Sequence, residues 1–425
     1  MIRLLCHRLR PPPITQAVER DSALEGVRGA CALLVFVAHL LLPFRVLDPV
    51  WTTSQRSFWI NLGYPAVLMF FVLSGYVIGL ITTQPAKAAT IQHYLRHRAA
   101  RLLPLNTVAV LICWLLLVHV ETRTILGNLL FLQNDEPYPG LGRFSLLGNN
   151  PNLWSLNYEA VYYLGFIALW FWAPPVGVVF GGLAALVCAH VFGLPAARIF
   201  ARYACGGFYW CSGLAVAWLC ARPETAGRRG NWPAVVLIAY AIWIFSPLRA
   251  LLIHAEWYGW IWPTPTPVSP HRLDFLPVCV WLLLTITGRA PAFQRWLAWI
   301  CLALAAVGLA GRIRSADWQE IDTVASIAFV AAVGLVRREF SLRPLELLAP
   351  VGAVSFGLYI IAAPLQLGQR AIAPGFSGSA LTFSVRLVLV VLLVAGAAWW
   401  LERRLCLPLS RWIRRVGTVD LPNRR

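Results

Sequence analysis

Long apolar runs recur along almost the whole of this chain, and they leave few folds open to it. Each run covers roughly 17–22 residues, the length at which an α-helix crosses the hydrocarbon core of a bilayer. The alternating strands of a membrane β-barrel are absent from the sequence. With a composition that is 59% hydrophobic and 13% charged, the chain is predicted to form an all-α, polytopic helical bundle in a membrane.

We expect twelve transmembrane spans, with ten to twelve as the range, because the apolar runs at 175–193 and 296–311 are short. The expected spans are 27–47, 62–82, 104–120, 154–172, 175–193, 204–221, 232–252, 274–288, 296–311, 322–337, 350–368 and 382–401.

Arginines cluster in the short segments between these spans. With a cytoplasmic amino terminus, the clusters follow spans two, six, eight, ten and twelve, and all of them face the cytoplasm, as the positive-inside rule predicts. We therefore expect an even number of spans with both termini in the cytoplasm. This topology accounts for the net charge of +18, so we expect the lipid bilayer as a partner and no nucleic acid.

The lysine and cysteine content argues against some classes of function. Lys87 is the only lysine, which excludes a Walker-type phosphate loop and argues against ATP-driven transport. The ten cysteines show neither metal-ligand spacing nor a disulfide framework, so we expect no metal and no permanently bound cofactor. We divide the chain into a cytoplasmic N-terminal segment, 1–24, one membrane domain, 25–401, and a basic cytoplasmic tail, 402–425.

Arg28 and His39 stand in the first expected span, with ten otherwise apolar residues between them. Titratable groups are costly inside a bilayer and usually have a function there. Eleven steps along an α-helix are close to three turns, so the two residues share one face, about 16 Å apart along the axis. They cannot touch, and one of them can lie near a membrane surface while the other lies deeper.

Four further segments carry polar groups within or beside apolar runs. The Ser74–Gly75 pair favours close helix packing over a catalytic role for Ser74. Arg98 and Arg101 are three residues apart, so one helical face can present both to phosphate groups. Glu159 opens an apolar span in aromatic company. The segments are Phe70–Tyr76, His93–Pro104, Asn152–Tyr163 and Gly352–Tyr359.

Two long loops, 121–153 and 254–273, are expected to face outward. Their tryptophans and polar side chains are able to stack on and hydrogen-bond a sugar. The alternative is an aromatic belt at the membrane interface.

These five segments, in this order, resemble the membrane acyltransferase-3 family of bacterial O-acyltransferases. The family's first-helix pattern matches Glu25, Gly26, Arg28, Gly29 and His39, with Glu25 in place of the usual Asp. Its later patterns match Phe70–Tyr76, then Arg98, Arg101 and Pro104, then Trp154, Ser155, Leu156, Glu159, Tyr162 and Tyr163, and finally Ser355, Leu358 and Tyr359. The chain departs from the family at Ala160, where a second acidic residue is common, and at Ala362, close to the position of a common histidine.

The resemblance implies acyl transfer, usually of acetyl, from cytoplasmic acyl-coenzyme A to a hydroxyl of an extracytoplasmic or lipid-linked glycan at a bacterial inner membrane. A sugar hydroxyl needs a general base, and histidine suits that task. We expect His39 to be this base. The other candidates are Glu159 and Arg28 as catalytic residues, then for the donor Arg98, Arg101, Ser74 and Tyr76, and for the acceptor Trp154, Ser155 and Tyr162.

Two alternatives remain open. Many spans and buried ionisable groups also suit a transporter or flippase of a lipid-linked glycan, although the two halves of the sequence show no repeat. The second alternative is a family member that has lost catalysis, because Ala160 and Ala362 depart from the family pattern.

Overall fold

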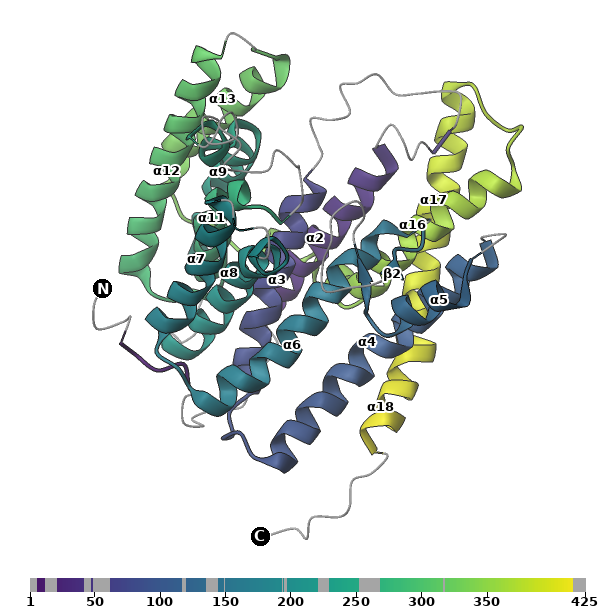
Figure 1. Ribbon diagram of the computed structural model, residues 1–425. Coiled ribbons are helices and arrows are strands. Elements are labelled where there is room, and N and C mark those ends of the chain that lie inside the picture. The colour runs from purple at the N-terminus through teal and green to yellow at the C-terminus, as the bar shows by residue number, and fades with distance from the viewer. Residues whose placement is uncertain are drawn as a thin grey trace. The chain divides into compact units, whose positions relative to one another are not determined.

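The computed structural model describes residues 6–11, 21–41, 47–48, 62–116, 120–134, 144–148, 150–192, 194, 197–220, 229–251, 268–315 and 318–415. This part of the chain is dominated by long helices (Figure 1). They are α2 (Ser22–Leu41), α3 (Gly63–Ile81), α4 (Ala88–Leu116), α6 (Trp154–Trp172), α7 (Val176–Val191), α8 (Ala197–Leu219), α9 (Trp232–Phe245), α11 (Leu276–Thr287), α12 (Pro291–Arg314), α13 (Glu320–Leu335), α16 (Ser355–Ile372) and α17 (Ala380–Trp400).

Shorter elements connect the long helices. The helical ones are α5 (Thr122–Leu129), η3 (Pro151–Leu153), η4 (Pro270–Phe275), α14 (Arg343–Glu346), α15 (Ala349–Gly352), the π-helical turn η5 (Leu401–Cys406) and α18 (Leu407–Arg415). Strand β1 (Gln133–Asn134) pairs in parallel with β2 (Phe144–Ser145), and β3 (Arg229–Gly230) pairs antiparallel with β4 (Phe340–Ser341).

The all-α membrane fold is confirmed. Each expected span coincides with one of the long helices. Within the described residues, six helices are long and apolar enough to cross a membrane, and the other expected spans are shorter or less apolar helices. The six are Ser22–Leu40, Gly63–Ile81, Ala88–Leu116, Trp232–Leu251, Pro291–Arg314 and Ala380–Ile413.

Contacts divide the chain into two compact units. The first unit contains Met1–Cys31, Tyr64–Thr83 and Trp172–Pro350, and in it α7 packs on α8 while α9 packs on α12 and α13. The second unit contains Ala32–Gly63, Gln84–Phe171 and Val351–Arg425, and in it α16 packs on α17 and α4, and α18 packs on α4 (Figure 1). The division falls inside α2, after Cys31.

The structure corrects two expectations about the segments between spans. The arginine-rich segment His93–Pro104, expected to precede the span at 104–120, is part of the same helix, because α4 begins at Ala88. Residues 88–103 are mostly good helix formers, and hydropathy alone does not mark a polar helical extension. The expected loop 121–153 contains α5, β1, β2 and η3, although 135–143 and 149 lie outside the described residues. Most of the second expected loop, 252–267, also lies outside them.

Prolines inside helices are accommodated by hydrogen bonds from distant side chains. A proline has no N–H for the carbonyl four residues earlier, which is then left without its helical donor. Because of Pro104 in α4, the Ala100 carbonyl has no helical donor, and the Ser410 hydroxyl of α18 donates to it over 2.5 Å instead. Because of Pro364 in α16, the Ile360 carbonyl has no helical donor, and it accepts from Asn150 Nδ2 at 2.7 Å instead. These bonds tie α4 to α18 and α16 to Asn150 within the second unit.

Candidate functional site

Helix α2 presents Arg28 and His39 on one continuous helix, as the sequence predicted. Arg28 is largely buried and forms an ion pair with Glu25, one helical turn earlier, with 2.9 Å between Nη1 and Oε1. Gly26 lies so close to α14 that a Cβ there would meet the carbonyl oxygen of Leu345 at 1.8 Å. The chain therefore packs tightly at the start of α2, and the charge of Arg28 is paired there.

His39 lies half-buried in the last turn of α2. Its Nδ1 is 2.7 Å from the carbonyl oxygen of Val35, and a carbonyl oxygen only accepts hydrogen bonds. Nδ1 therefore carries the proton. In the neutral ring this leaves the lone pair on Nε2, which is the nitrogen able to take a proton from another group.

Arg98 is held between two tyrosine rings of the second unit. Its guanidinium carbon lies 5.8 Å from the ring centre of Tyr94, one turn earlier on α4, and 5.5 Å from that of Tyr163 on α6. Tyr94 also donates its hydroxyl to the Tyr163 carbonyl at 3.1 Å. Cations over aromatic faces are stabilised by the ring quadrupole. The side chain is half-buried in this position.

Glu159 joins the same cluster, because the Tyr163 hydroxyl donates to its Oε1 one turn along α6. The structure thus gathers Arg98 and Glu159, both predicted from the sequence, around Tyr163. Arg101 lies one turn after Arg98 on α4 and is exposed. We call Tyr94, Arg98, Glu159 and Tyr163 the arginine–tyrosine cluster.

The predicted acceptor residues lie in the first turns of α6. Trp154 stacks edge to face on Tyr158, with 5.4 Å between ring centres, and Tyr158 on Tyr162 at 6.3 Å. The Ser155 hydroxyl is 2.8 Å from the Tyr359 hydroxyl of α16. All of these side chains are buried. The Ser155 hydroxyl therefore joins α6 to α16, and the aromatic rings pack on one another along α6.

Ser74 and Tyr76 belong to the first unit, on α3. The structure confirms close packing beside Ser74, because a Cβ on Gly75 would lie 1.9 Å from the Trp210 carbonyl oxygen of α8. Tyr76 is buried, and the guanidinium carbon of Arg289 lies 5.3 Å from the centre of its ring. Arg289 also donates to the carbonyls of Val216 and Ala217 near the end of α8.

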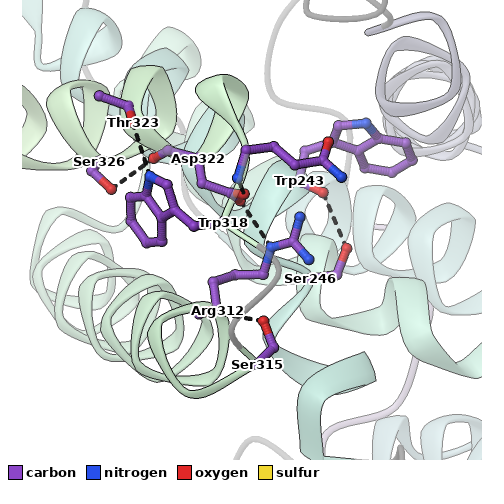
Figure 2. A network of polar contacts seen from close by, with 9 residues as sticks. Trp243, Ser246, Arg312, Ser315, Trp318, Asp322, Thr323 and Ser326 are labelled. Atoms are coloured by element: carbon purple, nitrogen blue, oxygen red, sulfur yellow. Dashed lines mark hydrogen bonds and ion pairs between the residues drawn. The ribbon is translucent and has the colours of Figure 1, made fainter.

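A buried ion pair that the sequence did not predict lies where α12 and α13 meet (Figure 2). Arg312 Nε donates to Asp322 Oδ1 over 2.8 Å, and the Asp322 side chain is fully buried. Its other oxygen accepts from the backbone N–H of Gln319 at 2.9 Å, which caps α13. Beside it, Trp318 Nε1 donates to Thr323 Oγ1 (Figure 2). This carboxylate is fully engaged in holding the helix hairpin.

Sequence reasoning also missed several long-range polar contacts of the second unit. The buried Gln366 donates to the His39 carbonyl, the buried Asn152 donates to the Tyr359 carbonyl, and the half-buried Glu402 accepts from the Gly357 N–H. The only signal for them is a polar residue inside an apolar run, which does not reveal its distant partner. No group of three or more metal-ligating side chains occurs among the described residues.

Comparison with known proteins adds one finding. A family described as an acyltransferase domain matches residues 21–403, which includes every candidate residue above. No curated protein and no solved structure matches this chain.

Proposed function

Because this chain belongs to the acyltransferase-3 family, we propose that it transfers an acyl group, acetyl in the first instance, from acyl-coenzyme A to a hydroxyl of a glycan. Family membership and the apolar helices support an acyltransferase of the membrane. The proposal has three further parts. The acyl donor binds from the cytoplasm, the acceptor glycan is extracytoplasmic or lipid-linked, and the chain lies in a bacterial inner membrane with both termini in the cytoplasm.

The observation that carries the proposal is the hydrogen bond between His39 Nδ1 and the Val35 carbonyl. It places the proton on Nδ1, so that in the neutral ring Nε2 carries the lone pair. In the proposed step, Nε2 takes the proton of the acceptor hydroxyl while the hydroxyl oxygen attacks the thioester carbonyl carbon. The carbon–sulfur bond breaks, and the imidazolium returns the proton to the departing coenzyme A sulfur. The products are the O-acyl ester and free coenzyme A.

For the donor, we propose that Arg98 and Arg101 bind phosphate groups of coenzyme A. Guanidinium groups suit phosphate because they combine a permanent charge with paired N–H donors. The tyrosine rings around Arg98 hold its side chain in place without neutralising it. Arg28 is proposed as a second contact to the donor on the face of α2 that carries His39.

For the acceptor, we propose the region around Trp154, Ser155 and Tyr162, with Glu159 orienting a hydroxyl or the catalytic base. The support for this part of the proposal is the family pattern at these positions, together with Glu159 on the same helix; the aromatic rings themselves pack on one another and are buried. The whole-chain family match favours this acyltransferase over the transporter alternative.

The test is transfer of labelled acetyl from acetyl-coenzyme A to glycan in membranes that contain the chain or its variants. His39→Gln keeps a hydrogen-bonding side chain but removes the base, and we expect at least a roughly 100-fold loss of transfer. His190→Gln is the matched control, because His190 also lies in the last turn of a helix, α7, and is no candidate for the base. Full activity of His39→Gln would contradict the role of His39.

A further inference from the structure

The His39 carbonyl is one of the last four carbonyls of α2, which ends at Leu41, and such carbonyls have no donor from within the helix. The residue four positions later in the sequence is a proline, which has no backbone N–H to donate. Gln366 on α16 supplies a donor instead, with 3.0 Å between its Nε2 and the His39 oxygen. Gln366 is buried, with 2% of its surface exposed.

At two prolines inside helices of the second unit, a distant side chain likewise donates to a carbonyl that has no helical donor. The Ser410 hydroxyl donates to the Ala100 carbonyl, which has no helical donor because of Pro104. Asn150 Nδ2 donates to the Ile360 carbonyl, which has none because of Pro364. The two carbonyls that accept those bonds belong to residues with no proposed catalytic role. The bond from Gln366 differs because the carbonyl belongs to the proposed general base itself.

Gln366 therefore acts on the residue whose ring must be placed accurately. His39 is fixed to its own helix by Nδ1, and its backbone is fixed to α16 by Gln366. Loss of the second bond removes one of the contacts that hold the last turn of α2. A displacement of about 1 Å at a reacting group can cost on the order of 100-fold in rate.

We propose that Gln366 is a positioning residue for His39, holding the backbone of the last turn of α2 so that Nε2 meets the acceptor hydroxyl. This inference rests on the proposed function of His39. It concerns the chemical step, so the loss of Gln366 lowers kcat and leaves the KM for the acyl donor unchanged.

The test compares Gln366→Met, which keeps the shape of the side chain but removes the donor, with Gln369→Met. Gln369 is the matched control, since it lies one turn further along α16 and also donates to a backbone carbonyl, that of Leu47. In purified protein with acetyl-coenzyme A and membrane glycan, we expect Gln366→Met to lower kcat by about 10- to 100-fold. We expect Gln369→Met to retain kcat within about twofold.

A second measurement separates positioning from general damage to the fold. In a His39→Ala background, Gln366→Met should lower the residual rate no further, because it acts through a side chain that is already gone. A further loss in that background would overturn the proposal, as would equal kcat values for the two methionine variants.

A third measurement does not depend on activity. Hydrogen exchange at the amides of residues 35–41 should be faster in Gln366→Met than in Gln369→Met, and equal rates would overturn the contact. Absence of acetyl transfer by the unaltered chain would instead refute the proposed function, while this exchange experiment would still decide whether Gln366 holds α2.

Discussion

Arg98 shows what one residue in this chain can and cannot reveal from sequence. Its pairing with Arg101 three residues later predicted a shared helical face, and α4 provides it. The tyrosine on the far side, Tyr163, comes from another helix 65 positions away, and no local pattern links the two. Sequence spacing identifies neighbours along one helix, whereas contacts between helices depend on packing that spacing does not encode.

Replacing Arg98 and Arg101 together by alanine should weaken the donor interaction. Each charge-assisted contact contributes about 1.5–3 kcal/mol, so we expect the KM for acetyl-coenzyme A to rise by at least about tenfold. The KM for the acceptor should change little. Steady-state kinetics with each substrate varied in turn checks this.

Arg96→Ala is the control for that experiment, because it removes one positive charge from the same stretch of α4 without touching the predicted pair. An unchanged donor KM in the double variant would remove phosphate binding from the roles of these arginines.

The helices as elements were well predicted, because each buries an apolar stretch whose length is set by the bilayer. Their boundaries were not well predicted. Pro104 marked the expected start of a span, yet α4 runs through it, since a hydroxyl from α18 replaces the missing backbone donor for Ala100. The same reasoning applies to Asn150 and Ile360. A proline breaks a helix only where nothing else satisfies the freed carbonyl.

Ser410→Ala should therefore destabilise the protein by about 1–3 kcal/mol, the cost of a buried unsatisfied carbonyl. In a Pro104→Ala background the backbone N–H returns, and the same change should cost less than about 0.5 kcal/mol. Denaturant unfolding in detergent micelles, monitored by tryptophan fluorescence, measures both values.

Ser384→Ala supplies the comparison, because the Ser384 hydroxyl bonds to the Ala380 carbonyl within its own helix and is exposed. It should be neutral. Equal costs of Ser410→Ala in the two backgrounds would show that the bond to Ala100 does not replace the proline's missing N–H.

At the scale of the whole molecule, hydropathy predicted a membrane protein and the order of its helices, but not its division into two compact units. That division depends on contacts between helices far apart in the chain. It also gives the basic stretch after residue 401 a packed role. There Glu402 accepts from the Gly357 N–H at the start of α16, and α18 packs on α4 through Ser410.

A chain that ends at residue 401 should lose at least about 2 kcal/mol of unfolding free energy relative to the full chain, because both contacts disappear. The unfolding midpoint in detergent compares the two chains. Equal midpoints for the 401 and 425 chains would show that η5 and α18 add nothing to the fold.

The carbonyl bonds also constrain how the protein is made. The hydroxyl that bonds the Ala100 carbonyl is synthesised 310 residues after it, and the Gln366 amide that bonds the His39 carbonyl is synthesised 327 residues after it. At roughly 5–20 residues per second, each carbonyl stays without that partner for about 15–65 s after its own helix has been synthesised. Helices α2 and α4 therefore reach their final form only when the last part of the chain leaves the ribosome, which makes late folding of the candidate site a property of its chain order.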